Sequence, residues 1–346
     1  MTDLELVQGD DYDKLESTLA SVPLEWLLDG DTFVRYRTLI DLRGAQDANK
    51  EVARARSLIH DDPLIKRIMD TRNGDGYWGT FQDIYQWWPR KDTTFWVLGM
   101  LADFGLRNDD EGIAQASEYV LSTQLPCGAF GWGPPATPGD CFTGILTESL
   151  AKLGYASDPR VARAYAWLIQ RQRLDGGFWC KNTAQPGGPR QGEPSCAFAT
   201  LCVLAALVHH PQLKDSQVAE NATAFLLECW ENRGKIKYAG HDSQIGRGWE
   251  KLKYPFTDYR ILKYLDTLSY LESAAQDPRI ECMVDLLVSK RDQHGYFYAE
   301  SIHTVWSDFD FGRKGSPSRW ITMLVYRIAR RLMLHRQRTG KPCTAP

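Results

Sequence analysis

The sequence predicts an all-α fold, an (α/α)6 toroid in which six helix pairs close into a double-walled barrel. Three observations predict it: a recurring Gly-aromatic turn, a capping residue that opens a helix after each turn, and two alternating helix compositions. We expect residues 1–346 to form one domain, with compact repeats over about 12–332 and a basic tail over 333–346.

The turns are the clearest repeat. Two segments begin with Asp-Pro, at Asp158 and at Asp277, and reach a Gly-aromatic turn at the same spacing, at Gly176 and at Gly295. Asp followed by Pro is typical of a helix start, since Asp caps the helix and Pro fits its first position. Related turns follow Gly74 and Gly128, and a weaker one follows Gly234. The chain therefore repeats a helix, a turn and a second helix.

Each second helix is expected to open at a residue that can cap it. These six starts are Asp31, Asp92, Asp140, Ser195, Asp258 and Ser318. Residues 97–102 and 197–207 are apolar nearly all round, which predicts buried inner helices. Residues 111–124 and 161–173 are amphipathic, which predicts outer helices with one wet face. An open solenoid of helix pairs is the structural alternative.

Composition limits the classes of protein. Apolar residues make up 43% of the 346, enough for a large core, and the net charge of −3 argues against a nucleic-acid binder. No apolar run is long enough for a membrane span, and the acidic start does not resemble a signal peptide. We therefore expect a cytoplasmic protein whose eight cysteines are thiols or ligands.

The C-terminal segment is the one basic stretch. It contains Arg327, Arg330, Arg331, Arg336, Arg338 and Lys341. We interpret it as a solvated helix end, where cations suit the helix dipole. Peripheral contact with a membrane or binding of a partner is the alternative.

Some turns resemble the QW motif of triterpene cyclases, in which a helix ends in Gln and a Gly-x-Trp turn follows. Here Gln124 precedes Gly131-Trp132, and Gln170 and Gln172 precede Gly177-Phe-Trp179. Nearly the whole chain is similar to short, one-domain bacterial proteins with prenyltransferase/squalene-oxidase repeats, the superfamily of terpenoid cyclases and protein prenyltransferases. The resemblance implies the toroid fold and an apolar, isoprenoid-like substrate.

The chain also departs from that pattern. The resemblance implies an Asp-x-Asp-Asp or Asp-Cys-Thr-Ala-Glu acid motif, yet only Asp308-Phe-Asp310 and Asp140-Cys141 partly match one. Triterpene cyclases have a second barrel, which this chain lacks. Protein prenyltransferases hold zinc with Asp-x-Cys, but Pro194 stands where the Asp before Cys196 belongs.

In a toroid, the N-termini of the inner helices meet at one mouth of the lumen. Helix N-termini favour anions and lower the pKa of nearby thiols. The predicted catalytic residues there are Asp92, Asp140, Asp258, Cys141, Cys180 and Cys196. The Asp residues can equally be helix caps, and the thiols can equally be core residues. If a metal is bound, the three cysteines are its expected ligands, and zinc is the candidate cofactor.

The loops before these helices add aromatic and polar side chains. The predicted substrate-binding residues are Trp88, Trp249, Tyr259, His303, Trp306, Asp308 and Trp320. Indole rings that line a lumen can stabilise a carbocation by cation–π attraction.

These features favour a terpenoid-cyclase-like enzyme, an isomerase or lyase, that folds an apolar substrate in the lumen. Protonation by a buried aspartic acid would start the reaction, because burial can keep a carboxylic acid neutral at pH 7. That mechanism needs no cofactor. One alternative is a zinc- or thiol-dependent lyase, hydratase or transferase that uses Cys141, Cys180 and Cys196. The other is a non-catalytic cup that binds a lipid or a peptide.

Overall fold

The structure is a computed structural model that describes residues 15–79, 92–132, 137–179, 192–236, 238, 248–258 and 260–338. Within these residues the one sheet is a pair of short antiparallel strands, β1 (Gly131–Trp132) and β2 (Thr137–Pro138). Residue contacts divide the chain into two compact units. Unit 1 comprises Met1–Ala55, Glu250–Tyr254 and Arg260–Pro346, and unit 2 comprises Arg56–Trp249 and Pro255–Tyr259.

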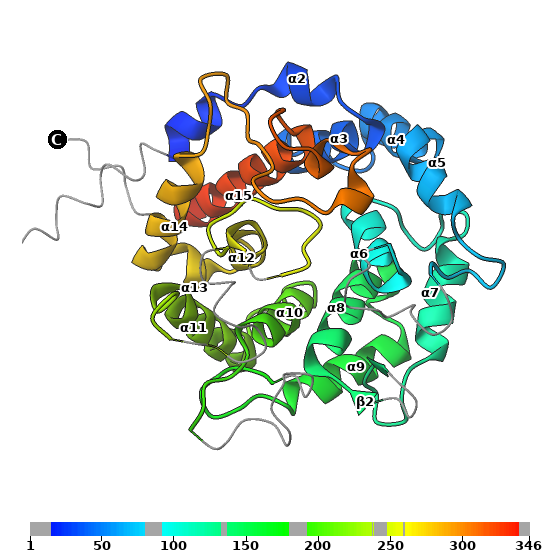
Figure 1. Cartoon of the computed structure of the whole chain (residues 1–346), viewed down its shortest axis with the longest axis vertical. Helices are drawn as coiled ribbons and strands as arrows, with labels where there is room; N and C mark the ends of the chain where they lie inside the picture. Colours follow the sequence, from blue (N-terminus) through cyan, green and yellow to red (C-terminus); the bar gives the residue numbers. More distant parts are fainter. Residues whose placement is uncertain are drawn as a thin grey trace, which may run out of the picture. The chain divides into compact units, whose positions relative to one another are not determined.

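In unit 2, helices alternate between two layers (Figure 1). One layer contains α6 (Thr94–Phe104), α8 (Asp140–Leu150), which continues into a π-helical turn (Ala151–Tyr155), and α10 (Ala197–Leu207). The other layer contains α5 (Pro63–Asp70), α7 (Ile113–Ser122), α9 (Pro159–Ile169) and α11 (Gln217–Glu231). Every residue of α10 is buried, which agrees with its uniformly apolar sequence.

Unit 1 is organised around the longest described helix, α15 (Arg319–Arg338). It packs against α3 (Thr32–Arg37), the π-helical turn Thr38–Leu42 that follows α3, and α12 (Ile261–Leu268). The remaining helices of the unit are α2 (Leu24–Leu28), α13 (Glu272–Ala275) and α14 (Pro278–Val288), with 3₁₀ turns at Thr304–Trp306 and Asp310–Gly312. Helix α4 (Lys50–Ser57) and a 3₁₀ turn (Ile59–Asp61) link the two units along the chain.

The six predicted second helices are all present, three in each unit of the described chain. They are α3, α6, α8, α10, α12 and α15, and each begins within a few residues of its predicted start. The exact caps differ from the prediction. Thr93, Gly139 and Arg260 hold the extended backbone that precedes α6, α8 and α12, so Asp92, Asp140 and Asp258 are not the cap residues of these helices.

The outer helices start as their sequences predict. Asp158 and Asp277 each cap a helix that opens with proline, and each carboxylate accepts a hydrogen bond from the backbone N–H two residues on. The same start recurs at Asp62-Pro63, where the Asp62 carboxylate accepts from the Leu64 N–H at 2.9 Å. One Asp-Pro signal thus opens α5, α9 and α14.

In four turns, a threonine of the inner helix that follows holds the aromatic residue. At α10, the Phe178 N–H donates to Thr200 Oγ1 at 2.9 Å, and at α15 the Phe297 N–H donates to Thr322 Oγ1 at 2.9 Å. Thr94 and Thr143 bind Trp78 and Phe130 in the same way. The glycine two residues before each of these aromatic residues has a positive φ, for example 83° at Gly176, which side chains disfavour.

Two glutamines of the QW-like motifs, Gln124 and Gln172, link their turns to the next outer helix. Gln172 Nε2 donates to the carbonyls of Gly176 and Val218, at 2.9 and 2.8 Å. Gln124 Nε2 donates to the carbonyls of Gly128 and Arg160, at 2.8 and 2.7 Å. Each glutamine therefore gives one hydrogen bond to a carbonyl of its own turn and one to a carbonyl in the first turn of the next outer helix.

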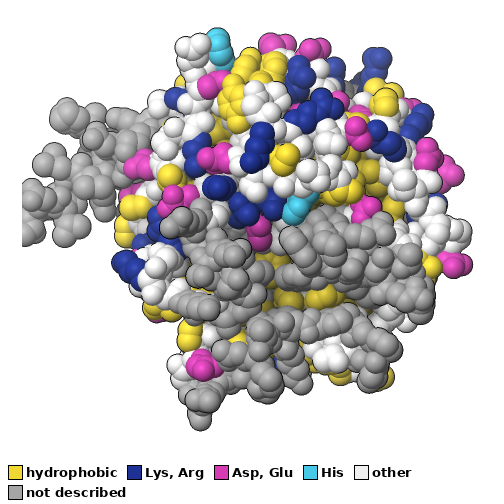
Figure 2. Space-filling model, in the orientation of Figure 1, with side chains coloured by type: hydrophobic (Ala, Val, Ile, Leu, Met, Phe, Trp, Pro, Cys, Tyr) yellow, Lys and Arg dark blue, Asp and Glu magenta, His cyan; other side chains and the backbone are white. Residues whose placement is uncertain are grey.

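The interpretation of the basic stretch as a solvated helix end is wrong for Arg327, which is 3% exposed and paired with Asp266. Arg331 contacts the same carboxylate, so these cations belong to the core of unit 1. No helix in the described ranges combines the length and hydrophobicity that a membrane crossing requires. Acidic and basic side chains are interspersed on the described surface in Figure 2.

Candidate functional site: a carboxyl group among aromatic rings

Unit 1 contains a cluster of large aromatic side chains, here called the aromatic cluster. Its members are Phe33, Tyr254, Trp306, Phe309, Phe311 and Trp320. Phe309 stacks on Phe311 with ring centroids 4.8 Å apart, and Tyr254 meets Trp320 edge-on at 5.5 Å. Two predicted substrate-binding residues, Trp306 and Trp320, therefore lie in one cluster. The faces of such rings attract a nearby cation.

Asp310 lies in the chain between two members of this cluster, Phe309 and Phe311. Its Oδ1 is 2.7 Å from Ser318 Oγ, and its Oδ2 accepts hydrogen bonds from the backbone N–H groups of Arg319 and Trp320, at 2.6 and 3.3 Å. Ser318 Oγ also accepts the Ile321 N–H at 3.1 Å. The 3₁₀ turn Asp310–Gly312 thus aims the Asp310 carboxyl group at the first turn of α15.

The environment of Asp310 favours the neutral acid. Burial raises its pKa above the ordinary value and outweighs the lowering effect of the hydrogen bonds from Ser318 and the two N–H groups. Ser318 Oγ donates to Asp310 Oδ1, so this contact by itself favours the ionised carboxylate, and burial is what favours the neutral acid. The residue as a whole has intermediate exposure, while its two carboxyl oxygens are held by Ser318 and by the backbone N–H groups of Arg319 and Trp320.

Asp308 and His303 precede Asp310 in the chain. Asp308 is exposed, and its carbonyl accepts a hydrogen bond from Arg313 Nη2 at 2.9 Å. His303 is partly buried and precedes the 3₁₀ turn Thr304–Trp306. The sequence singled out Asp308, but the carboxyl group held within the aromatic cluster is that of Asp310.

In unit 2, Asp140 is buried at the start of α8. Its Oδ2 accepts the Trp179 N–H at 3.0 Å, and its Oδ1 lies 3.3 Å from Arg171 Nε. Both contacts stabilise the ionised carboxylate. Asp140 is therefore arranged as an anion that holds the turn after α9 against α8.

Cys141 and Cys196, also in unit 2, are 1% and 2% exposed. Cys196 caps α10: its Sγ accepts from the Ala199 N–H at 3.4 Å, and its own N–H donates to the Phe178 carbonyl. Cys180 lies outside the described residues. Among the residues that the structure describes, no group of three or more His, Cys, Asp or Glu side chains is placed to hold a metal ion.

Asp92 and Asp258 are partly buried, and both precede inner helices of the chain, α6 and α12. Trp249 is 2% exposed and packs edge-on against Trp230 of α11, with ring centroids 6.2 Å apart. Trp88 and Tyr259 lie outside the described residues. The predicted site residues are thus divided between the two units.

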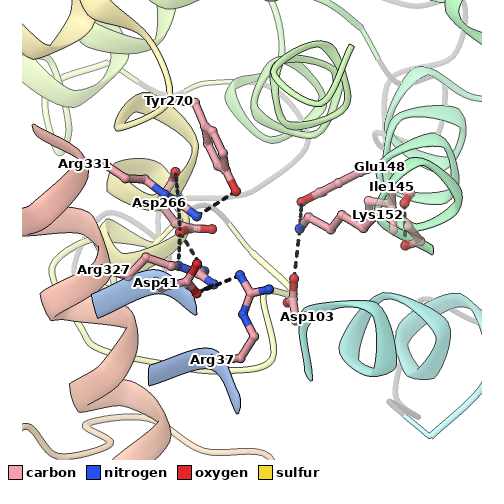
Figure 3. Close-up of polar contacts among 11 residues, drawn as sticks. Arg37, Asp41, Asp103, Ile145, Glu148, Lys152, Asp266, Tyr270, Arg327 and Arg331 are labelled. Carbon is pink, nitrogen blue, oxygen red and sulfur yellow. Dashed lines mark hydrogen bonds and ion pairs between the residues drawn. The ribbon is translucent and has the colours of Figure 1, made fainter. Parts of the chain in front are cut away.

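The sequence analysis missed two buried charge clusters, drawn in Figure 3. In unit 1, Asp266 Oδ1 lies 2.7 Å from Arg327 Nη2 and 3.0 Å from Arg331 Nη1. Burial alone raises the pKa of the neighbouring Asp41, but the guanidinium groups of Arg37, Arg327 and Arg331 hold it below its ordinary value. Arg37 and Asp41 lie four residues apart, but Asp266 and Arg327 are far apart in the sequence, so no local pattern indicates the whole cluster.

The second buried cluster belongs to unit 2 and centres on Lys152 (Figure 3). Lys152 Nζ lies 2.9 Å from Asp103 Oδ1 and also contacts the Glu148 carboxylate, one helical turn earlier. The Glu148–Lys152 spacing is a helical ion-pair signal that the sequence does contain. Asp103 adds a second acid from the end of α6.

Paired helices in two layers, with aromatic turns held by glutamine and threonine, define the α/α-toroid class that the sequence predicts. The family model of the squalene-hopene cyclase C-terminal domain matches residues 82–262, more than half of the chain. The protein therefore belongs to this family, and the family resemblance inferred from the QW-like turns is confirmed.

Similar solved structures include a type II terpene cyclase, MstE from Scytonema, in complex with merosterolic acid A. It is 14% identical, with 94% of this chain and 99% of that chain covered and a TM-score of 0.48. A protein from Actinoplanes is 13% identical (92% and 99% covered, TM-score 0.46), as is an α-mannanase from Bacteroides thetaiotaomicron (97% and 99% covered, TM-score 0.45). Such likenesses carry no information about activity. No curated protein matches the chain.

Proposed function

We propose that this protein is a terpenoid-cyclase-like enzyme that protonates an apolar, isoprenoid substrate, with Asp310 as the acid. The observation that carries the proposal is the Asp310 carboxyl group, whose pKa is raised by burial and which lies in the chain between Phe309 and Phe311 of the aromatic cluster. A general acid must hold its proton at the working pH, and a raised pKa favours that state.

The proposed reaction begins when the Asp310 O–H gives its proton to one carbon of a substrate double bond. The π electrons form the new C–H bond and leave a cation on the other carbon. The indole rings of Trp306 and Trp320, with the phenyl rings beside them, favour that cation. Further double bonds can then close rings, and loss of a proton ends the reaction, so the net change is an isomerisation.

The hydrogen bonds to Asp310 support the same step. As the proton leaves, negative charge forms on the carboxylate, and the N–H groups of Arg319 and Trp320 already point at Oδ2. Donors fixed before the reaction stabilise developing charge without rearrangement. Asp310 then recovers a proton, either from the final cation or from water.

Asp92, Asp140 and Asp258 are the other candidate acids. Asp140 fits the role less well, because Arg171 and the Trp179 N–H hold it as a carboxylate. The roles of Trp88, Trp249, Tyr259, His303 and Asp308 in substrate binding are part of the same proposal. If the parent is active and no aspartate variant loses activity, we expect the thiol-dependent enzyme, with or without zinc. If the parent shows no turnover, we expect the non-catalytic cup.

The test is incubation with squalene, farnesol, geranylgeraniol and their diphosphates, in D₂O and in H₂O, with products analysed by mass spectrometry. Protonation by the enzyme should place one deuterium from the solvent in the product. Asp310→Asn should keep its hydrogen bonds and its melting temperature but lose activity by ~10²–10⁴-fold. The matched control is Asp109→Asn, because that side chain is 78% exposed and is not proposed to bind the substrate.

The three other Asp→Asn variants are assayed in parallel. If one of Asp92, Asp140 or Asp258 is essential and Asp310→Asn is fully active, the acid has been assigned to the wrong residue. Products without solvent deuterium would contradict protonation of the substrate by any group of the enzyme.

A further inference from the structure

Unit 2 contains a pocket of about 810 Å³ that is separate from the residues considered so far as a catalytic site. The segment after α9, the residues shortly before α10, and α11 with the segment that follows it line the pocket. Its volume falls within the range of small-molecule binding sites. The lining residues that carry the argument are Leu174, Glu193, Phe225, Glu228, Ile236 and Tyr238.

The apolar part of the pocket combines two aromatic rings with an aliphatic rim. Phe225 and Tyr238 are buried and meet edge-on, with ring centroids 6.1 Å apart and an interplanar angle of 84°. Leu174 and Ile236 are 98% and 43% exposed, and they are two of the few large apolar side chains exposed in the described chain. Exposed apolar side chains next to a pocket are typical of a surface that binds something.

The charges around the pocket are mainly negative. Three carboxylates line it, those of Asp175, Glu193 and Glu228, against one guanidinium group, that of Arg173. Asp175 already accepts hydrogen bonds from Ser195, at 2.7 and 2.8 Å, so its carboxylate is used inside the protein. Glu228 is exposed on α11. The remaining negative charge favours a positively charged ligand.

Tyr238 gives the pocket a polar contact. The residue is 5% exposed, and its hydroxyl makes no hydrogen bond of ordinary geometry with any other residue that the structure describes. Burial and the nearby Cys229 thiol raise the pKa of Tyr238, so the hydroxyl stays protonated. Buried polar atoms are normally satisfied by a partner or by water.

We propose that this pocket is a second ligand site, which binds an organic cation with an apolar body, such as an alkylammonium ion. Aromatic faces beside carboxylates are the chemistry that recognises ammonium groups. The Glu228 carboxylate and the Tyr238 ring hold the cationic head, and Leu174 and Ile236 cover the apolar chain. The site is independent of the proposed acid, Asp310, and does not rest on the proposed reaction.

The test is calorimetric titration of the full-length protein with three matched probes: hexyltrimethylammonium, hexanol and hexyl sulfate. We expect the cation to bind at least tenfold more tightly than the alcohol and the sulfate. Glu228→Gln should weaken binding of the cation about tenfold and leave hexanol unchanged. Glu220→Gln is the matched control, since it lies on the exposed surface of the same helix but does not line the pocket.

Two further results keep the proposal falsifiable. Phe225→Leu should weaken binding of the cation more than binding of hexanol, because the substitution removes an aromatic ring and keeps an apolar side chain. Asp310→Asn should bind hexyltrimethylammonium as the parent does. Equal binding of the three probes, normal binding by Glu228→Gln, or loss of binding in Asp310→Asn would each overturn the assignment.

Discussion

Arg327 Nη2 lies 2.7 Å from Asp266 Oδ1, and both side chains are only 4% exposed. Removal of Arg327 leaves the buried Asp266 carboxylate with Arg331, at 3.0 Å, so its charge stays partly compensated. Arg327→Met should therefore lower the free energy of unfolding by about 1.5–3 kcal/mol, the range for hydrogen bonds to charged groups, measured by urea denaturation. Arg35→Met, which breaks the half-exposed pair with Glu51, is the control and should cost at most about 1 kcal/mol. Similar losses in both variants would contradict the prediction.

Gly144 allows α8 and α10 to approach closely. A Cβ atom at Gly144 would lie 2.7 Å from the Cys202 carbonyl oxygen, a backbone atom that cannot turn away. Gly144→Ala should destabilise the protein by about 1–3 kcal/mol. At Gly74 an added Cβ meets no atom within 4 Å, so Gly74→Ala should change stability by less than about 0.5 kcal/mol. Thermal melts of the two variants compare the same chemical change.

Gln172 links the turn after α9 to α11 through two hydrogen bonds. Gln172→Ala should cost about 1–3 kcal/mol, because two carbonyls lose their donor. The control is Gln217→Ala, which removes one exposed contact with Asn221 on the surface of α11. Equal stability of the two variants in chemical denaturation would show that the glutamine of the motif does not hold the turn.

Asp110 should make the protein sensitive to acid. Burial raises the pKa of Asp110. The hydrogen bonds from Arg56 and from the Arg107 N–H lower this pKa, as do the charges of Arg56 and His60, and together they outweigh the effect of burial. Because the pKa of Asp110 is lower in the folded than in the unfolded protein, its carboxylate stabilises the fold at pH values above its unfolded pKa of about 3.9. This stabilisation is lost as the pH falls through the folded pKa.

Asp110→Asn should accordingly be less stable than the parent at pH 6, and its stability should depend less on pH below about 4. Asp109→Asn is the neighbouring control, because that side chain is 78% exposed. Unfolding measured between pH 6 and pH 2.5 tests the slopes. A parent and an Asp110→Asn variant with identical slopes would exclude Asp110 as a source of the acid sensitivity.

The sequence predicts the helices well because their signals are local. An Asp-Pro start, a Gly-aromatic turn and an apolar helix such as residues 197–207 each lie within one short segment. The prediction of the exact cap residues was less accurate. Gly139, not Asp140, has the extended backbone before α8, because the buried Asp140 side chain binds Trp179 across the unit instead of its own helix end.

The candidate site depended on information that the sequence does not carry. Trp306 and Trp320 could be selected as aromatic residues near the start of an inner helix, but their common cluster also includes Phe33, which is hundreds of residues away. From the sequence, Asp310 was seen only as part of an incomplete motif. Its suitability as an acid depends on burial and on the N–H groups at the start of a later helix, which the sequence does not show. The partners of Arg327 were missed for the same reason.

The threonine contacts of the turns have a consequence for how this protein can change. The same pair of atoms closes segments of very different length: the segment from Phe297 to Thr322 is nearly twice as long as that from Phe130 to Thr143. Loop closure becomes only slowly costlier as a loop lengthens. Insertions between such a turn and its inner helix should therefore leave the scaffold intact, so that new loops, and with them new chemistries, can be exchanged one repeat at a time.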